Sequence, residues 1–213
     1  MKFDKGIKKK YRQAIEESFQ TIMEKGNDRH RRTMKLILDS KMLVRVQPVK
    51  DINGSGITGA IDVGRLNDRI ESERLSLNEA FGEIYISIAE ETIDTGFQRG
   101  CQGTFAHENQ HAHDFAQTIE SISNADVNPL SVFNPNLYEL EWEAHLAAGE
   151  YALQIGSPEF LDEGVTLMIL GRGETGCFVD HDGIRRRLKE SYGMELGGNV
   201  GPLASQMLGL RDR

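Results

Sequence analysis

The chain has 213 residues, of which 38% are hydrophobic and 27% charged, and it carries a formal net charge of -8. This length and composition fit one packed globular domain and exclude a disordered or fibrous chain. The acidic balance opposes general attraction to nucleic acid or anionic lipid, so we expect neither as a partner. Basic runs such as Arg185 to Arg187 are interpreted as solvated helix faces or as local contacts for an anion.

The chain lacks the apolar segments that would direct it to a membrane. It contains no run of about 18 apolar residues, and residues 1–18 lack the apolar core of a signal peptide. Its two cysteines are too few for a disulfide scaffold. We therefore expect no membrane span, and a location in the cytoplasm or secretion by a route that needs no signal peptide.

Two helices are expected first. From Lys5 to Lys25 apolar residues recur at helical spacing, Gly26 provides a stop, and a shorter helix follows from Arg29 to Asp39. Residues 1–40 are thus a helical N-terminal part, either integral to a single domain of residues 1–213 or an appendage to it.

Three strands are expected next. Met42 to Val49 and Ile57 to Val63 alternate apolar and polar residues around the turn sequence Asn53 to Gly56, which predicts a hairpin with a longer loop. Gly82 to Ala89 has the clearest strand pattern, with isoleucines at every second position.

The rest of the chain is expected to be mainly helical. Apolar stripes predict long helices from about Thr104 to Ile122 and from Leu137 to Ile155, separated by a loop from Asn124 to Asn136. Shorter helices are expected at Pro158 to Leu170 and Gly183 to Tyr192. The predicted fold class is α+β, with a small mixed or antiparallel sheet packed on the first long helix.

That helix carries the sequence His107-Glu108-Asn109-Gln110-His111. Histidines four residues apart project from one helix face, so both imidazoles can bind one zinc ion. Glu108 lies beside them, where it can take a proton from an attacking water and return it to a leaving amine. With only six histidines in the chain this order is rare by chance, and it predicts a Zn2+-dependent hydrolase with Glu108 as the catalytic residue and His107 and His111 as ligands.

A third ligand must come from another segment. The metzincin pattern requires glycine and histidine where this chain has Asp114 and Gln117, so that class is excluded. The second long helix offers Glu141, Glu143 and His145. On a helical wheel Glu141 lies nearer than Glu143 to the buried stripe, and His145 stays a candidate because imidazole also binds zinc.

The segment Glu141-Trp142-Glu143-Ala144-His145-Leu146-Ala147-Ala148 resembles the E-x-E-A-N/D-x-x-A segment of ImmA/IrrE-like gluzincin metallopeptidases and the E-x-x-A-D segment of HtpX-like ones. The resemblance covers about residues 84–153, with His145 standing where these families carry Asp or Asn. It implies a zincin-like fold, metallopeptidase activity on a protein or peptide, Glu141 as the third zinc ligand, and an edge strand at residues 82–89 that pairs with an extended substrate.

Further side chains are candidates for supporting roles. Asp114 could accept the second N–H of a ligand histidine, and Cys101 could approach the metal, although a small buried side chain is the favoured interpretation of this cysteine and of Cys177. A donor to the developing oxyanion is also needed, and the candidates are His181, Tyr138, Tyr151 and Tyr192.

Two other functions compete with the peptidase. One is a non-enzymatic regulatory or binding protein that keeps a metallopeptidase-like core. The other is a di-iron helical bundle, because Glu108 and His111 also satisfy the Glu-x-x-His spacing, although such sites need a second copy of that motif.

Overall fold

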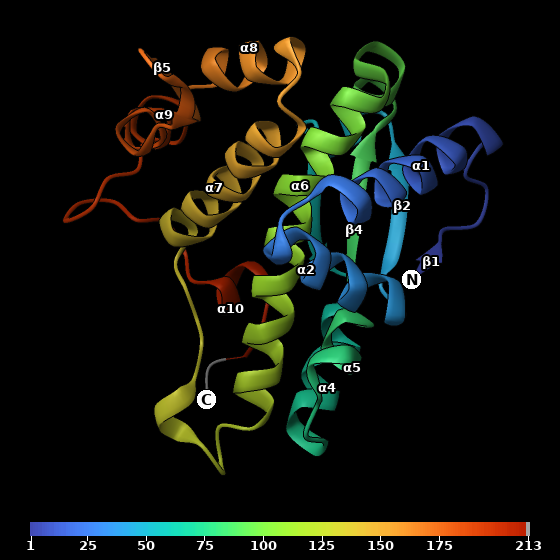
Figure 1. Ribbon diagram of the computed structural model, residues 1–213. Helices are drawn as coiled ribbons and strands as arrows, with labels where there is room; N and C mark the ends of the chain where they lie inside the picture. Colours follow the sequence, from blue (N-terminus) through green and yellow to red (C-terminus); the bar gives the residue numbers. More distant parts are fainter. Residues whose placement is uncertain (212–213) are drawn as a thin grey trace.

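The computed structural model describes residues 1–211 and shows an α+β fold. In that part of the chain ten α-helices and one 3-10 helix accompany a small mixed sheet and a separate hairpin (Figure 1). The strands are β1 (Lys2–Phe3), β2 (Leu43–Gln47), β3 (Gly56–Ala60), β4 (Ile84–Ala89), β5 (Leu170–Gly173) and β6 (Gly176–Val179). The helices are α1 (Lys9–Lys25), α2 (Asp28–Asp39), α3 (Val49–Ile52), α4 (Val63–Ser72), α5 (Leu77–Phe81), α6 (Glu90–Ser123), η1 (Pro129–Ser131), α7 (Leu137–Ile155), α8 (Pro158–Thr166), α9 (His181–Tyr192) and α10 (Ala204–Met207).

The four-stranded sheet has the order β1-β2-β4-β3. Strands β1, β2 and β4 are parallel, and β3 runs antiparallel to β4, with Thr58 opposite Ile86. The predicted hairpin is therefore wrong, because β4 lies between the two strands that were expected to pair. The physical reason is burial, because every residue of β4 except Tyr85 is buried. Such a strand is more stable inside the sheet, between two neighbours, than at a half-exposed position.

The same topology corrects the expected substrate-binding edge. Residues 82–89 do not form an edge of the sheet, since β4 has a neighbour on each side. The edge next to β4 is β3, which contacts α6 and brings Gly56 and Thr58 toward that helix.

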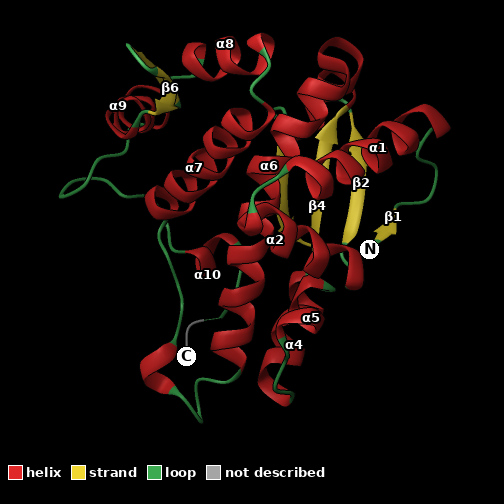
Figure 2. Ribbon diagram, viewed as in Figure 1, coloured by secondary structure: helices red, strands yellow, loops and turns green. Residues whose placement is uncertain are grey.

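Helix α6 packs on the sheet and is the longest element of the described chain (Figure 2). It begins at Glu90, well before the predicted start at Thr104, and is interrupted at Phe97, whose φ of 46° and ψ of -139° are not helical. Its buried face includes Phe105, Ala112 and Ile119, which join the isoleucines of β4 in the main hydrophobic cluster.

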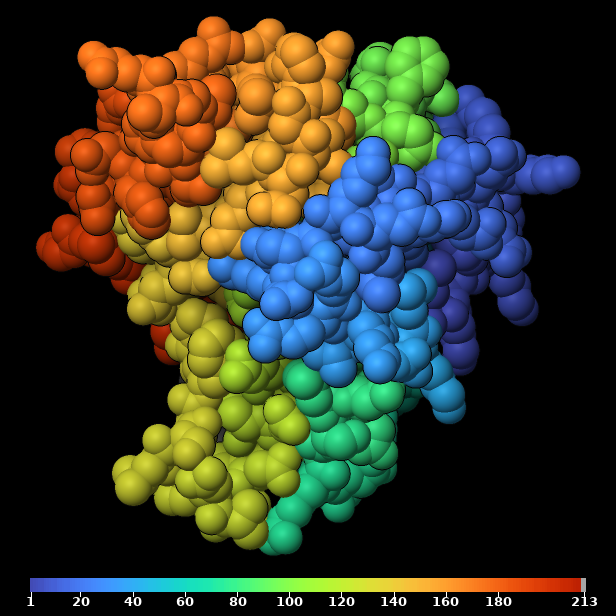
Figure 3. Space-filling view, viewed as in Figure 1, coloured from blue at the N-terminus to red at the C-terminus, as the bar shows by residue number. Residues whose placement is uncertain are grey.

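The N-terminal helices belong to this same cluster. Tyr11, Ile15 and Phe19 of α1 are buried there, and the ring of Phe19 meets that of Phe105 edge-on at 4.5 Å between centroids. Helix α2 adds Met34 and Ile37. Figure 3 shows these first forty residues, in blue, packed closely against the rest of the molecule.

A second hydrophobic cluster lies on the other side of α7. Helices α8 and α9 and the β5–β6 hairpin contribute to it, and its buried members include Ile169, Leu170, Ile184 and Leu188. The helix predicted over residues 158–170 ends at Thr166, and Leu170 instead begins β5. Met168 lies in the left-handed region at φ 59°, so the chain leaves the helix there.

Helices α4 and α5 are additional to the expected elements, although each begins with residues typical of a helix N-cap. Asp62 caps α4 by accepting from the backbone N–H of Arg65, and Ser76 and Glu79 form a capping box at α5. Both helices contribute to the main cluster through Leu66, Ile70, Ala80 and Phe81. None of the helices in residues 1–211 combines the length and the apolar character needed to cross a membrane.

Candidate metal and catalytic site

The two histidines of the H-E-x-x-H sequence lie side by side on α6. His107 and His111 are one helical turn apart, and their Nε2 atoms approach to 3.0 Å. The side chain of His107 is 18% exposed and that of His111 is 10% exposed, so both lie at the bottom of a depression. Two imidazole nitrogens thus point at one small volume.

Helix α7 brings a carboxylate to the same volume. It begins with a capping box formed by Asn136 and Glu139, which sets the start of the helix one turn before Glu141. The carboxylate oxygens of Glu141 lie 3.4 Å from Nε2 of His107 and 3.5 Å from Nε2 of His111. Glu143, the rival third ligand, points elsewhere and forms an ion pair of 2.6 Å with Arg29.

The spacing of these three donors suits a small metal ion. Ligand atoms at about 2.0 to 2.1 Å from a tetrahedral zinc lie roughly 3.3 Å from one another, and the three observed separations are 3.0, 3.4 and 3.5 Å. In addition, Oε2 of Glu141, one of these three donors, is buried without a hydrogen-bond partner within the described residues. Buried polar atoms without partners are costly, so the donor set fits a bound cation.

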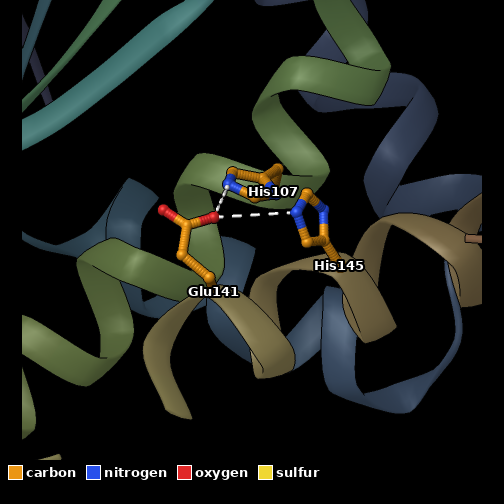
Figure 4. Close-up of side chains that lie close together, drawn as sticks. All are labelled: His107, Glu141 and His145. Atoms are coloured by element: carbon orange, nitrogen blue, oxygen red, sulfur yellow. Dashed lines mark ion pairs between the residues drawn. The ribbon is translucent and has the colours of Figure 1, made fainter. Parts of the chain in front are cut away.

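His145 offers a further nitrogen nearby. Donor atoms of His107, Glu141 and His145 all lie within 4.8 Å of one another, and Figure 4 shows the three side chains turned toward a common point. However, Nε2 of His145 lies 3.7 Å from Glu141 and accepts a hydrogen bond of 3.2 Å from Nε of Arg187. Because this lone pair is already engaged, Glu141 is the better third donor.

The electrostatics of the cluster also favour a cation. Burial alone would raise the pKa of Glu141, but the imidazoles of His107 and His111 outweigh it and lower that pKa. Burial alone would lower the pKa of His111, but Glu141, together with Glu108 and Asp114, raises it to about 9. In contrast, burial and the neighbouring His107 lower the pKa of His145 to about 2, so this imidazole is neutral.

Glu108 is held apart from the donor set. Its Oε2 accepts a hydrogen bond of 2.7 Å from Oγ1 of Thr58 on β3, and the residue is 5% exposed. Gly56 of β3 approaches so closely that a Cβ there would lie 2.8 Å from Cγ of Glu108. Strand β3 therefore fixes the carboxylate of Glu108, a contact between distant segments that no local sequence pattern indicates.

Several supporting residues lie elsewhere than expected. Asp114 accepts from the side-chain amide of Gln110 at 2.7 Å, and it is not bonded to His111. The thiol of Cys101 is buried, which raises its pKa to about 12, and its Sγ lies 3.9 Å from the carbonyl oxygen of Ala14. Neither residue contributes a donor to the cluster, and Cys101 is the buried side chain that the sequence favoured.

The four candidate oxyanion donors are separated by the structure. Tyr192 lies on the wall of the cavity beside Glu141, and burial together with that carboxylate raises its pKa. Tyr151 also lines the cavity, but its hydroxyl donates to Gln102 at 2.8 Å. Tyr138 stacks on Trp142, and His181 also contacts that indole ring. Neither residue is among those that line the cavity.

These groups open into a cavity of about 560 Å³. One wall is the loop and edge strand of residues 52–58, the floor is α6 together with Glu141 of α7, and the opposite wall is formed by the rest of α7 with α8 and α9. The far wall is mostly apolar, with Ala148, Phe160, Leu167 and Ile169, and includes Arg187 and Tyr192. The cavity therefore runs between the two hydrophobic clusters of the molecule, past the metal-binding candidates.

Comparison of the chain with protein-family models, with curated proteins and with solved structures finds no match.

Proposed function

We propose that the protein is a zincin-like, zinc-dependent hydrolase that cleaves peptide bonds. The observation that carries the proposal is the convergence of His107, His111 and Glu141 within 3.5 Å, with Glu108 beside them as a carboxylate outside the donor set. A zinc ion held by these three residues would supply Lewis acidity toward a carbonyl group and a water molecule.

Glu108 is suited to the proton transfers of hydrolysis. One of its oxygens accepts from Thr58, which fixes the carboxylate, and no hydrogen bond from residues 1–211 engages the other oxygen, which can take a proton from water. The same group can then deliver that proton to the leaving amine. Glu108 as a whole is only 5% exposed, so this transfer would be largely shielded from bulk solvent.

The edge strand β3 supports a peptide as the substrate. Residues 56–58 line the cavity, and within residues 1–211 β3 pairs only with β4, which leaves its other side without a strand. An extended peptide can add to such an edge through main-chain hydrogen bonds, which give affinity without selecting side chains. Glu108 and the three metal-binding candidates line the same cavity as residues 56–58, so a peptide on this edge would pass the reacting groups.

The arrangement offers less support to a di-iron site. Such a site needs further carboxylates on facing helices. Among the described residues that line the cavity, the only carboxylate besides Glu108 and Glu141 is Glu163, which forms a 3.0 Å ion pair with Arg99. A hydrolase with one metal ion is therefore the better explanation of the side chains that line the cavity.

Glu108→Gln tests the proposed function. The variant should bind zinc stoichiometrically, as measured by elemental analysis, but cleave an unstructured peptide pool about 100 to 10,000 times more slowly, because a positioned general base is lost. The matched control is Glu143→Gln on α7, a carboxylate that pairs with Arg29 away from the donor set. Equal cleavage by Glu108→Gln and the parent protein would refute the proposal, whereas stoichiometric zinc without cleavage by the parent would favour a binding protein.

A further inference from the structure

Arg187 differs from the other partly buried arginines of the described chain in its partners. Arg29, Arg45, Arg69 and Arg99 are also neither exposed nor fully buried, and each forms an ion pair with a carboxylate. Within residues 1–211, no carboxylate lies within 4.0 Å of the guanidinium of Arg187. A partly buried cation without a counterion is less well stabilised than a paired one, so this guanidinium is suited to an anionic ligand.

Two hydrogen bonds fix the guanidinium in place. Its Nε donates to Nε2 of His145 at 3.2 Å, and its Nη1 donates to the carbonyl oxygen of Leu167 at 3.4 Å. A guanidinium has five N–H groups, so three remain for another acceptor. The group is thus held rigidly while most of its donors are still available.

Arg187 also lies on the cavity wall at the metal-binding candidates. His145, its hydrogen-bond partner, approaches Glu141 to 3.7 Å, so a single imidazole separates the guanidinium from the donor set. Phe160, Leu167 and Ile169 line the same wall. Because apolar neighbours lower the local dielectric, a charge-assisted hydrogen bond would be stronger here than at an open surface.

We propose that Arg187 binds a carboxylate of the peptide substrate, next to the bond that is cleaved. The planar fork of a guanidinium matches a carboxylate with two parallel hydrogen bonds. The carboxylate can be the C-terminus of a peptide or an acidic side chain, and both present the same pair of oxygens. The peptide nature of the ligand rests on the proposed function, whereas the carboxylate preference rests on Arg187 itself.

The test measures binding, separately from cleavage. A random hexapeptide pool is synthesised twice, once with free C-terminal carboxylates and once with C-terminal amides, and each is captured on immobilised, zinc-loaded Glu108→Gln protein. Captured peptides are quantified and sequenced by mass spectrometry. We expect carboxylate-bearing peptides to be enriched about 10- to 100-fold, the range for a hydrogen bond to a charged group.

The two pools distinguish the sources of the carboxylate. Enrichment of the free-acid pool over the amide pool identifies the C-terminus, and enrichment of Asp- and Glu-containing members within the amide pool identifies a side chain. Adding Arg187→Met should abolish either enrichment, and Arg187→Lys should retain part of it, because the charge stays while the fork is lost. Arg186→Met is the matched control, since it removes an exposed neighbouring arginine of α9 that the cavity does not include.

Failure of this inference is separable from failure of the hydrolase. No carboxylate preference in the Glu108→Gln background, or a preference that survives Arg187→Met, overturns the role of Arg187 even if the parent protein cleaves peptides. Conversely, Arg187-dependent capture without any cleavage by the parent supports the carboxylate site and refutes the peptidase. Equal zinc content in the Arg187 variants and the parent shows that the donor set is intact.

Discussion

The residues on the floor of the cavity and those on its walls differ in how far the sequence alone predicts their positions. The floor groups His107, His111 and Glu141 lie on two adjacent helices, α6 and α7, and their spacing within each helix determines their direction. The wall groups Thr58 and Arg187 lie on β3 and α9. In the sequence β3 precedes helices α6 and α7, and α9 follows them. The candidates for the floor can therefore be predicted from local periodicity, whereas the walls depend on how distant elements meet.

The largest expected effects concern the floor. His107→Ala should abolish stoichiometric zinc binding and peptide cleavage, and Glu141→Ala should weaken zinc binding by more than the roughly 100-fold typical of losing an outer partner of a ligand. His145→Ala should keep the zinc, because its Nε2 already accepts from Arg187. Metal content after dialysis against a graded chelator series provides the measurement. Loss of zinc from His145→Ala with retention in Glu141→Ala would reverse the assignment of the third ligand.

An intermediate effect is expected where the β3 wall touches the floor. In Gly56→Ala the added Cβ would lie 2.7 Å from Cγ2 of Thr104 and 2.8 Å from Cγ of Glu108, so Glu108 must move. A displacement of about 1 Å near the reacting groups can reduce turnover by about 100-fold. The control is Gly54→Ala, whose Cβ would meet only the carbonyl oxygen of Gly56 at an ordinary 3.5 Å. Steady-state peptide cleavage at equal zinc content compares them, and equal rates would show that β3 does not constrain Glu108.

The smallest expected effect tests the hydrogen bond between wall and floor. Thr58→Val keeps the branched shape but removes the hydroxyl that donates to Glu108 at 2.7 Å, and we expect kcat to fall about 10-fold. KM and zinc content should stay the same, because the bond orients Glu108 and does not touch the donor set. Thr58→Ser should restore most of the rate. A change confined to KM would instead place Thr58 in substrate binding.

The sheet illustrates the limit of local prediction. The isoleucines of residues 84–88 correctly predict a strand, but alternation alone suggests a half-exposed strand and cannot show that β4 is covered on both faces. Local alternation therefore assigns the pairing to the nearest turn, Asn53 to Gly56, and does not indicate the central position of β4. The crossover that inserts β4 between β2 and β3 depends on packing against α6, not on the turn.

The basic run Arg185 to Arg187 shows the same limit at the site. Three consecutive arginines on α9 are equivalent in sequence, and a solvated face describes Arg185 and Arg186, which are exposed. Only the packing of α9 against α7 turns Arg187 toward the cavity and His145.

By itself the sequence determined an α+β chain in which two histidines lie one helical turn apart and a later helix carries carboxylates. These features follow from the periodicity of helices and strands. The tertiary structure decided which carboxylate meets the histidines, which strand borders the cavity and which arginine faces it. Those choices follow from contacts between residues far apart in the chain, which no local pattern encodes.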